Sequence, residues 1–413
     1  KLDLACPTFY HPPSMKIFHL ADLHLGKAVY GRELLEDQEL ILDQVLDSAR
    51  RDKPAALVVA GDVFDRAVPS ADAVRLFGRF IAGLKDLDPD MVVALIPGNH
   101  DSGARLAYLS AVLGRTGIHI RSDADECDTP VVVRRDGQTL RLWLVPFLTP
   151  GAFPPSEQPN ASGLGELFDD AARPVTLRSQ ADLFSEAVRR IRAAKDGLSP
   201  AADVLVCHVF AAGGGASESE RAFLGTAELV DASMFDAFDY AALGHLHRPQ
   251  AAGSRGRYPG SPLCYSFGDD ESERGFLKVE LRPGGADAEL VPLKPLRAMR
   301  RIQGAFRELL DGARWSGFEG DYVEAVLSDA EPVLNPVDAL RRRFPWLLSV
   351  RQEAFEREQS DAPGLPGAGA QARDIVDEFR SFHRVVLGRD TSANMEELFI
   401  EFLKEARNAS RQA

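Results

Sequence analysis

Short apolar runs that alternate with longer amphipathic stretches restrict the fold of this chain more than any other feature. Six runs have the length of a strand and are rich in leucine or β-branched residues: 16–20, 56–60, 91–96, 140–145, 203–207 and 239–243. Three stretches between them carry apolar residues on one helical face: 33–50, 70–84 and 103–113. Because strands and helices alternate, we expect a layered α/β domain over residues 15–290.

Composition separates this domain from the segments around it. Residues 151–178 are rich in proline, glycine and serine and predict a long surface loop. A strand, helix, strand, helix pattern restarts over 294–351 and predicts a small separate α/β domain, bounded at 291–357. We expect residues 1–14, which precede Met15, to be a non-native or upstream extension.

The end of the chain predicts a tethered pair of helices. Residues 358–370 are rich in glycine and proline, as flexible linkers are. Within 371–413, apolar residues recur at helical spacing over 371–387 and 394–407. Two helices on a flexible linker cannot bury such faces alone, so we expect them to dock on another surface.

Charge and cysteine content limit the classes of partner. The 48 basic and 62 acidic residues give a net charge of −14, so the surface as a whole repels nucleic acid. A polyanionic substrate remains compatible, because bound divalent cations reverse the local sign. The four cysteines are far apart and form no CxxC pair, which predicts neither disulfides nor a thiolate zinc site and fits a reducing cytoplasm. Neither a membrane span nor a secretory signal is expected from the apolar pattern.

Polar side chains follow five of the predicted strands directly. They include two carboxylates, one amide and five imidazoles, namely Asp22, His24, Asp62, Asn99, His100, His208, His245 and His247. In open α/β folds, ligands bind outside the carboxyl ends of the strands. Residues two apart on an extended chain point the same way, so Asp22 and His24, or His245 and His247, can each serve one site together. We therefore expect these side chains to meet at one rim.

This donor set predicts a pair of metal ions. Imidazole and carboxylate ligands without thiolate suit Mn²⁺, Fe²⁺ or Zn²⁺. Without His100, seven of these side chains remain as possible ligands. Seven are too many for one tetrahedral ion and fit two ions that share a carboxylate, the usual arrangement for phosphoryl chemistry. Asp62, in a tight turn led by glycine, is the expected shared ligand, and His100 remains to act on the phosphate.

The alternative interpretation is structural. GD and GN are common turn dipeptides, and a lone histidine after a strand is usually a core or turn residue. Five of the nine histidines nevertheless fall within these motifs, which favours the metal interpretation. The other four, which show no such grouping, are expected to be structural or surface residues: His11, His19, His119 and His383.

The order Asp-x-His, Gly-Asp-x-x-Asp, Gly-Asn-His-Asp, a lone His and Gly-His-x-His resembles the calcineurin-like metallophosphoesterase superfamily. Within it, MKIFHLADLHLG, GDVFD, GNHDSG, GHLHRPQ and YPGSPLCYSFGD are similar to the SbcD family of DNA-repair nucleases. The resemblance implies a layered β-sandwich flanked by helices, a small α/β capping domain and a C-terminal helical pair. It also implies two Mn²⁺ ions, double-strand exonuclease activity, and single-strand and hairpin endonuclease activity.

The resemblance also implies roles for individual residues. One metal would be bound by Asp22, His24, Asp62 and His247. The other would be bound by Asp62, Asn99, His208 and His245. His100 would position or protonate the scissile phosphodiester, and Asp101 would orient His100.

Partners follow from the same resemblance. Segment 294–351 has ten basic and eight acidic residues and would cap DNA, although a solvated helix face around Arg341–Arg343 is the alternative. Residues 371–407 would bind an SbcC-type coiled-coil ATPase, or else dock on the chain's own core. The apolar faces of 70–84 and 103–113 would form a homodimer, or else belong to the core.

Two other functions use the same motifs. A metal-dependent phosphomonoesterase or nucleotide phosphodiesterase needs the same metal site, because fold and metal motif do not set the substrate. A non-catalytic scaffold is the other alternative, although His100 and a full ligand set weigh against it.

Overall fold

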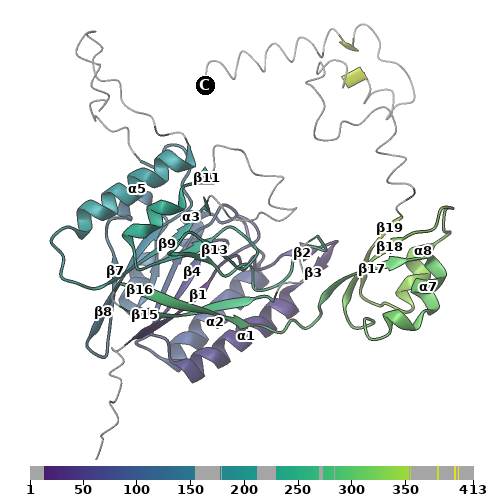
Figure 1. Cartoon of the computed structure of the whole chain (residues 1–413), viewed down its shortest axis with the longest axis horizontal. Helices are drawn as coiled ribbons and strands as arrows, with labels where there is room; N and C mark the ends of the chain where they lie inside the picture. The colour runs from purple at the N-terminus through teal and green to yellow at the C-terminus, as the bar shows by residue number, and fades with distance from the viewer. Residues whose placement is uncertain are drawn as a thin grey trace, which may run out of the picture. The chain divides into compact units, whose positions relative to one another are not determined.

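A computed structural model gives the architecture of the chain (Figure 1). It describes residues 14–153, 177, 179–211, 229–268, 273–282 and 284–352, together with 354, 379–380, 395–396 and 399. The described residues cluster into two compact units. The first unit holds residues up to 301 with 317–324 and 346–349, and the second holds 302–316, 325–345 and residues from 350 onward.

The first large sheet contains three of the predicted strands, β1 (Met15–Leu20), β4 (Ala56–Ala60) and β5 (Val92–Ile96), and a fourth parallel strand, β6 (Ile118–Ile120), which was not predicted. Its order is β16-β15-β1-β4-β5-β6. On the other side of β1, β15 (Gly275–Arg282) and β16 (Gly285–Pro292) are antiparallel.

The second large sheet repeats this arrangement with later strands. Its order is β13-β14-β12-β9-β8-β7. Its parallel strands are β8 (Gln138–Val145), β9 (Ala202–His208), β12 (Tyr240–Gly244) and β14 (Gly256–Tyr258). The antiparallel edges are β7 (Val131–Arg135) and β13 (Gln250–Ala252). In the described loops, two pairs of short strands are β2 (Ala28–Val29) with β3 (Arg32–Glu33) and β10 (Phe210–Ala211) with β11 (Leu229–Val230), and a single bridge joins Leu25 to Phe64.

The two sheets pack face to face as a sandwich. Alternate residues of the central strands, such as Ile17 and Val58 in one sheet and Leu142 and Val204 in the other, form one buried cluster. The residues between them, such as Val59, point to the outer faces. Because side chains alternate across a strand, these near-continuous apolar runs are buried on both faces.

Helices cover both outer faces of the sandwich (Figure 1). Helices α1 (Leu35–Asp52) and α2 (Ala71–Leu87) pack on the first sheet through one apolar cluster. Helix α5 (Gln180–Lys195) packs on the second sheet and begins with a capping box formed by Ser179 and Asp182. The predicted fold class, a layered β-sandwich flanked by helices, is therefore confirmed.

The prediction of one helix over 103–113 is wrong. The segment forms two short turns, α3 (Gly103–Leu106) and α4 (Ser110–Leu113), followed by the 3₁₀ turn η1 (Gly114–Thr116). Leu109 between them has a φ of 65°, which interrupts the helical hydrogen-bond pattern. Tyr108 and Leu109 are mostly exposed, whereas Leu106 and Leu113 are partly buried against the core, so the apolar residues here do not form one buried helical face.

The described residues from 299 to 352 include a three-stranded sheet of order β17-β18-β19. The elements, in chain order, are β17 (Met299–Gly304), α7 (Phe306–Asp311), η6 (Ala313–Trp315), β18 (Tyr322–Leu327), α8 (Pro336–Arg341) and β19 (Leu347–Gln352). Ile302, Leu309, Leu340 and Phe344 are fully buried. The strand, helix, strand, helix pattern expected here is present, and β19 was not predicted.

Several predictions fall largely outside the described residues. They are the extension 1–14, the loop 151–178, the linker 358–370, the helices 371–387 and 394–407, and the residues His11 and His383. Among the few described residues of this region, the rings of Phe379 and Phe399 stack with centroids 4.0 Å apart, and Arg380 pairs with Glu396. Among the described helices, none has the length and apolar character needed to cross a membrane.

Candidate metal centre

Polar side chains from five strand ends converge at one edge of the sandwich. The ends belong to β1, β4 and β5 in the first sheet and to β9 and β12 in the second. The residues are, in chain order, Asp22, His24, Asp62, Asn99, His100, His208, His245 and His247. Because these strands are parallel within each sheet, their carboxyl ends face the same edge. The contacts described next connect every one of these side chains.

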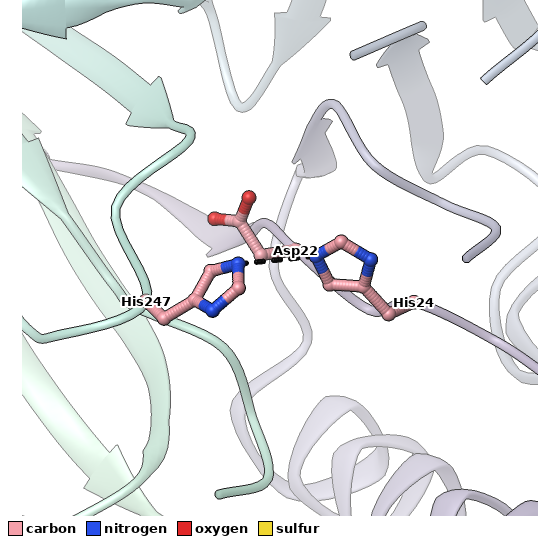
Figure 2. Close-up of side chains that lie close together, drawn as sticks. All are labelled: Asp22, His24 and His247. Atoms are coloured by element: carbon pink, nitrogen blue, oxygen red, sulfur yellow. Dashed lines mark hydrogen bonds between the residues drawn. The ribbon is translucent and has the colours of Figure 1, made fainter. Parts of the chain in front are cut away.

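One group consists of Asp22, His24 and His247, whose ligand atoms all lie within 4.8 Å of one another. Figure 2 shows the two imidazole rings turned toward each other with the carboxylate of Asp22 beside them. The two Nε2 atoms are 3.1 Å apart. His24 and Asp22 are fully buried. Two imidazoles and a carboxylate therefore face a common point.

A second group consists of Asn99, His208 and His245. Nε2 of His208 lies 2.9 Å from Oδ1 of Asn99 and 3.3 Å from Nδ1 of His245. Nδ1 of His245 lies 3.2 Å from the same Asn99 oxygen. These three side chains also meet at one point, supplied by loops of both sheets.

Asp62 lies between the two groups. Its Oδ2 atom is 3.7 Å from Nε2 of His24 and 3.5 Å from Nε2 of His208. Its Oδ1 atom accepts a hydrogen bond of 2.9 Å from the backbone N–H of His100. The hydrogen bond to Oδ1 thus fixes the orientation of the carboxylate, and Oδ2 faces an imidazole from each group. Asp62 is the residue expected from the sequence to be the shared ligand, and this role stays a prediction.

The backbone is strained at four of these positions. Asp22, His24, Asp62 and His245 have φ values of 53°, 43°, 49° and 106°. Each such conformation costs of order 1–3 kcal/mol, and residues of this kind cluster at functional sites. These four residues, which lie close together in space, therefore keep unfavourable backbone conformations. This indicates that the fold preserves the positions of their side chains at the expense of loop stability.

Glycines allow these loops to approach one another closely. A Cβ at Gly61 would overlap the ring of His208, and a Cβ at Gly98 would overlap the carboxylate of Asp62. A Cβ at Gly244 would overlap the carbonyl of Ala60. The glycines of the GD, GN and GH dipeptides therefore create the space in which the polar side chains meet.

The donor set fits divalent cations. The carbonyl oxygen of Ala60 accepts from Nδ1 of His208 at 2.9 Å, so a neutral His208 presents a lone pair at Nε2. That lone pair faces the carbonyl oxygen of Asn99, and two acceptors at 2.9 Å repel each other unless a cation or proton lies between them. Oxygen and imidazole ligands of this kind suit Mn²⁺, Fe²⁺ or Zn²⁺.

Burial keeps these imidazoles in the form that binds metal. Desolvation is the main cause that lowers the pKa of His208, lowers that of His245 to about 3 and lowers that of His247 well below its usual value. All three rings are therefore neutral at pH 7, and a neutral imidazole is the ligating form.

His100 and Asp101 lie beside the donor groups. Nδ1 of His100 donates to the backbone carbonyl of Asp65 at 3.0 Å, and its ring meets the ring of His24 edge-on, with centroids 4.8 Å apart. The Asp101 carboxylate accepts from the backbone N–H groups of Val63, Phe64 and Gly98 at 2.9–3.0 Å.

This geometry corrects the expected role of Asp101. The group that orients the His100 ring is the Asp65 carbonyl, and Asp101 instead ties the loop after β4 to the loop after β5. Burial, reinforced by the charge of Asp62, raises the pKa of Asp101 to about 6.

Sequence reasoning missed the residues that support the ligands. Gln38, buried on α1, donates to the carbonyl of His24 at 2.7 Å and accepts from the N–H of Gly26 at 2.9 Å. The hydroxyl of Tyr265 donates to the carbonyl of Leu23 at 2.5 Å. The Asp65 carboxylate accepts from Lys27 at 2.6 Å. The available signals were a polar Gln38 beside the apolar stripe of 33–50 and the second aspartate of GDVFD.

The histidine expected to be structural in β1 has that role. His19 is fully buried between the sheets. Its Nε2 donates to the carbonyl of Leu243 at 3.2 Å, and its Nδ1 accepts from the Tyr240 hydroxyl at 2.9 Å. His119 lies on β6, away from the donor groups. Cys207, next to His208, is buried, and burial raises the pKa of its thiol, so it offers no thiolate.

One family of known proteins matches most of the part of the chain that forms the sandwich. The calcineurin-like phosphoesterase family matches residues 15–249. Similar solved structures include a protein of Thermus thermophilus (14% identity, TM-score 0.38, covering 67% of this chain and 99% of that one). GAP50, the anchor in the inner membrane complex of Plasmodium, has 14% identity and a TM-score of 0.36, covering 68% and 84%. A dimetal phosphatase from Danio rerio has 14% identity and a TM-score of 0.35, covering 65% and 93%.

Proposed function

The chain belongs to the calcineurin-like phosphoesterase family, and from this premise we propose that it is a two-metal DNA nuclease of the SbcD type. Membership implies a metal-dependent hydrolase of phosphate esters. The proposal adds the substrate, DNA, and the metal, Mn²⁺. It also adds exonuclease activity on duplex ends and endonuclease activity on single strands and hairpins.

The observation that carries the metal part of the proposal is the position of Asp62 Oδ2 between imidazoles of both donor groups. We assign one cation to Asp22, His24, Asp62 and His247, and the other to Asp62, Asn99, His208 and His245. Bound divalent cations would polarise the phosphodiester and lower the pKa of a water molecule to near neutrality.

The chain's own residues supply positioning and proton transfer. Because Nδ1 of His100 donates to the Asp65 carbonyl, Nε2 is the atom left to exchange a proton with an oxygen of the phosphodiester. Asp101 holds the loops of Asp62 and His100 in register through three backbone amides. His100 is half-buried and Asn99 is exposed, so this side of the site is open to a substrate.

We propose DNA as the substrate for two reasons. The segment 294–351 is basic, and the motifs that precede it in the sequence are similar to those of the SbcD nucleases. Several of its basic residues are paired within the first or second unit, for example Arg301 with Glu324 and Arg300 with Asp321. Arg341 and Arg342, at the end of α8, are exposed. We propose these two as backbone contacts to DNA, because such contacts use arginine without reading sequence.

Two protein partners complete the proposal. We propose that 371–407 binds a coiled-coil ATPase of the SbcC type, which would cover the apolar faces expected on these helices. We also propose a homodimer through the face formed by α2 and the turns of 103–113. An apolar groove of about 1010 Å³, lined by residues such as Phe77, Ile81 and Leu106, opens there.

The homodimer is supported by the shape of this face. Beside the groove, Tyr108, Leu109 and Val112 expose 73%, 52% and 56% of their surface. A two-fold interface uses the same patch on both subunits, and a groove beside a protruding apolar turn can make such a patch self-complementary. Contiguous exposed apolar side chains such as these are typical of interaction sites.

The test is a metal-stripped assay with cations restored one at a time. The full chain is given linear duplex, hairpin and single-stranded DNA and a small phosphomonoester. We expect Mn²⁺ to restore DNA cleavage, and the double variant R341E/R342E to cleave duplex DNA less while its phosphomonoester turnover is unchanged. Rapid phosphomonoester turnover with intact DNA would instead identify a phosphatase.

A further inference from the structure

The carboxylate of Asp65 lies behind one of the proposed metal ligands. Asp65 follows Asp62 in the loop after β4, and its backbone N–H donates to the carbonyl of Leu25 at 3.2 Å. The same loops are joined by hydrogen bonds from His24 to Asp62 and from Leu25 to Val63, at 3.0 and 2.9 Å. Asp65 is therefore fixed against the loop that carries His24.

The two nitrogens of the His24 ring face different surroundings. Nε2 faces the donor groups, at 3.1 Å from Nε2 of His247 and 3.7 Å from Oδ2 of Asp62. Nδ1 is buried on the opposite side, 3.5 Å from Oδ1 of Asp65, and has no hydrogen-bond partner among the described residues. A neutral imidazole carries its proton on one nitrogen only, so the partner of Nδ1 decides whether Nε2 has a lone pair.

From these contacts we infer that Asp65 is a positioning residue that keeps the proton of His24 on Nδ1 and so leaves the Nε2 lone pair for a cation. This inference rests on the proposed metal site. A histidine that binds metal usually donates its other ring N–H to a carboxylate or carbonyl, and Asp65 is the carboxylate facing that atom.

Lys27 holds the Asp65 carboxylate in place. Its Nζ atom donates to Oδ1 of Asp65 at 2.6 Å, so the oxygen that faces His24 is also the one that Lys27 binds. Lys27 in turn lies 5.5 Å from the centre of the Tyr265 ring. The charge of Lys27 favours an ionised Asp65, which accepts hydrogen bonds and has no proton to donate.

Asp65 also reaches the proposed catalytic histidine through its main chain. Its carbonyl oxygen accepts from Nδ1 of His100 at 3.0 Å. One residue thus sets the protonated nitrogen of two imidazoles, with its side chain toward His24 and its backbone toward His100. Substituting the side chain at Asp65 removes the first interaction and leaves the carbonyl in the chain, so the two effects are separable.

The experiment uses the full-length, metal-stripped chain with Mn²⁺ as the only probe. Calorimetry measures Mn²⁺ affinity for the wild type, D65A, D65N and H24A. Nitrogen-15 NMR of the metal-free protein reports the His24 tautomer, with H24A identifying its signals. D72A is the matched control, because it removes an exposed carboxylate that pairs with Arg75. Circular dichroism and thermal melting show whether each variant is folded.

We expect D65A to weaken one of two Mn²⁺ sites by about 10- to 100-fold, the range for a lost outer-shell partner. His24 should move from the Nδ1-protonated to the Nε2-protonated form in D65A. D65N keeps an acceptor oxygen and should restore most of the affinity and the wild-type tautomer. D72A should match the wild type in both measurements.

The variants distinguish failure of the Asp65 inference from failure of the proposed metal site. If H24A binds Mn²⁺ weakly but D65A has wild-type affinity and tautomer, the role of Asp65 is wrong and the metal site stands. If H24A itself binds two Mn²⁺ ions with wild-type affinity, the proposed metal site is wrong. If D65A does not fold, D65L replaces it, because leucine has a similar shape and cannot accept a hydrogen bond; wild-type affinity and tautomer in a folded D65L would overturn the inference.

Discussion

The Oδ2 atom of Asp62 lies 3.5 Å from Nε2 of His208, although the two residues lie at the ends of strands that belong to different sheets. Asp62 follows β4, in the middle of the first sheet, and His208 ends β9, in the middle of the second. The distance between them is therefore set by how the two sheets pack, through residues such as Val58 and Val204. The apolar core of the sandwich thus determines the geometry of the polar site at its edge.

Replacing Asp62 should affect both proposed cations together. D62A removes the carboxylate whose oxygen faces both donor groups, so we expect both Mn²⁺ sites to weaken by more than about 100-fold, beyond the range for an outer-shell partner. Calorimetric titration measures the stoichiometry and affinity. D65N and D72A, which leave Asp62 in place, provide the comparison. A variant that loses one ion and keeps the other at wild-type affinity would show that Asp62 is not shared.

Replacing His100 should separate catalysis from metal binding. H100A removes the imidazole proposed for proton transfer and leaves the seven proposed ligands in place, so we expect cleavage to fall by about 10²- to 10⁴-fold. Mn²⁺ affinity should change by less than about threefold, since His100 is assigned to the phosphate. Gel assays on duplex DNA measure the rate, and calorimetry measures the affinity. Equal losses of both would make His100 a ligand.

The sequence was sufficient to predict which residues meet, and insufficient to predict how they are held. Strand ends and residue types indicated Asp62 and His208, because parallel strands must present their carboxyl ends at one edge. The partners of Nδ1 in His208 and His100 are backbone carbonyls of Ala60 and Asp65. Any residue type supplies a carbonyl, so no pattern of side chains indicates such a contact.

The parts of the fold that sequence reasoning missed have similar causes. Strands β15 and β16 extend the first sheet beside β1, from a segment more than 250 residues away in the chain. Five of the eight residues of β16 are glycine, alanine or acidic and none of the eight is buried, which leaves a weak apolar signal. In 103–113, apolar spacing predicted a helix, but only part of the apolar set, such as Leu106, packs on the core, and Leu109 is exposed.

A side chain at Gly98 should disturb the proposed metal site directly. In G98A the new Cβ would lie closer to Oδ1 of Asp62 than the 3.0 Å that Cβ atoms keep from other atoms, so the loop must shift. We expect a loss of about 1–3 kcal/mol in unfolding free energy, as for overpacking, together with weaker Mn²⁺ binding. Urea unfolding and calorimetry measure the two effects. G320A is the control, because a Cβ there has nothing within 4 Å. A G98A protein with wild-type stability would contradict this prediction.

His19 should make the protein less stable in acid. Burial lowers the pKa of folded His19 to about 3, from the value of 6.5 that an exposed histidine of the unfolded chain has. Below pH 6.5 the unfolded chain binds a proton that the native state does not, so stability falls as the pH falls from 6.5 toward 3. One such group contributes a slope of up to about 1.4 kcal/mol per pH unit.

The variant H19Q isolates this contribution. It removes the titrating ring and retains donor and acceptor atoms for Leu243 and Tyr240. The other buried histidines remain, so the difference between the wild-type and H19Q curves of unfolding free energy against pH belongs to His19. We expect H19Q to be less stable than the wild type at pH 7 and to lose less stability on acidification. Parallel curves would contradict the assignment.

A charge on the apolar face beside α4 should separate the proposed homodimer. Val112 exposes 56% of its surface in the monomer, so V112D costs the monomer little, whereas a carboxylate buried in an apolar interface would be strongly unfavourable. We expect light scattering to give twice the chain mass for the wild type and the chain mass for V112D, with unchanged melting of the monomer. V132D, at an exposed valine of β7 in the other sheet, is the control and should remain dimeric. A wild type that is monomeric at tens of micromolar, or a V112D that stays dimeric, would show that this face does not form the interface.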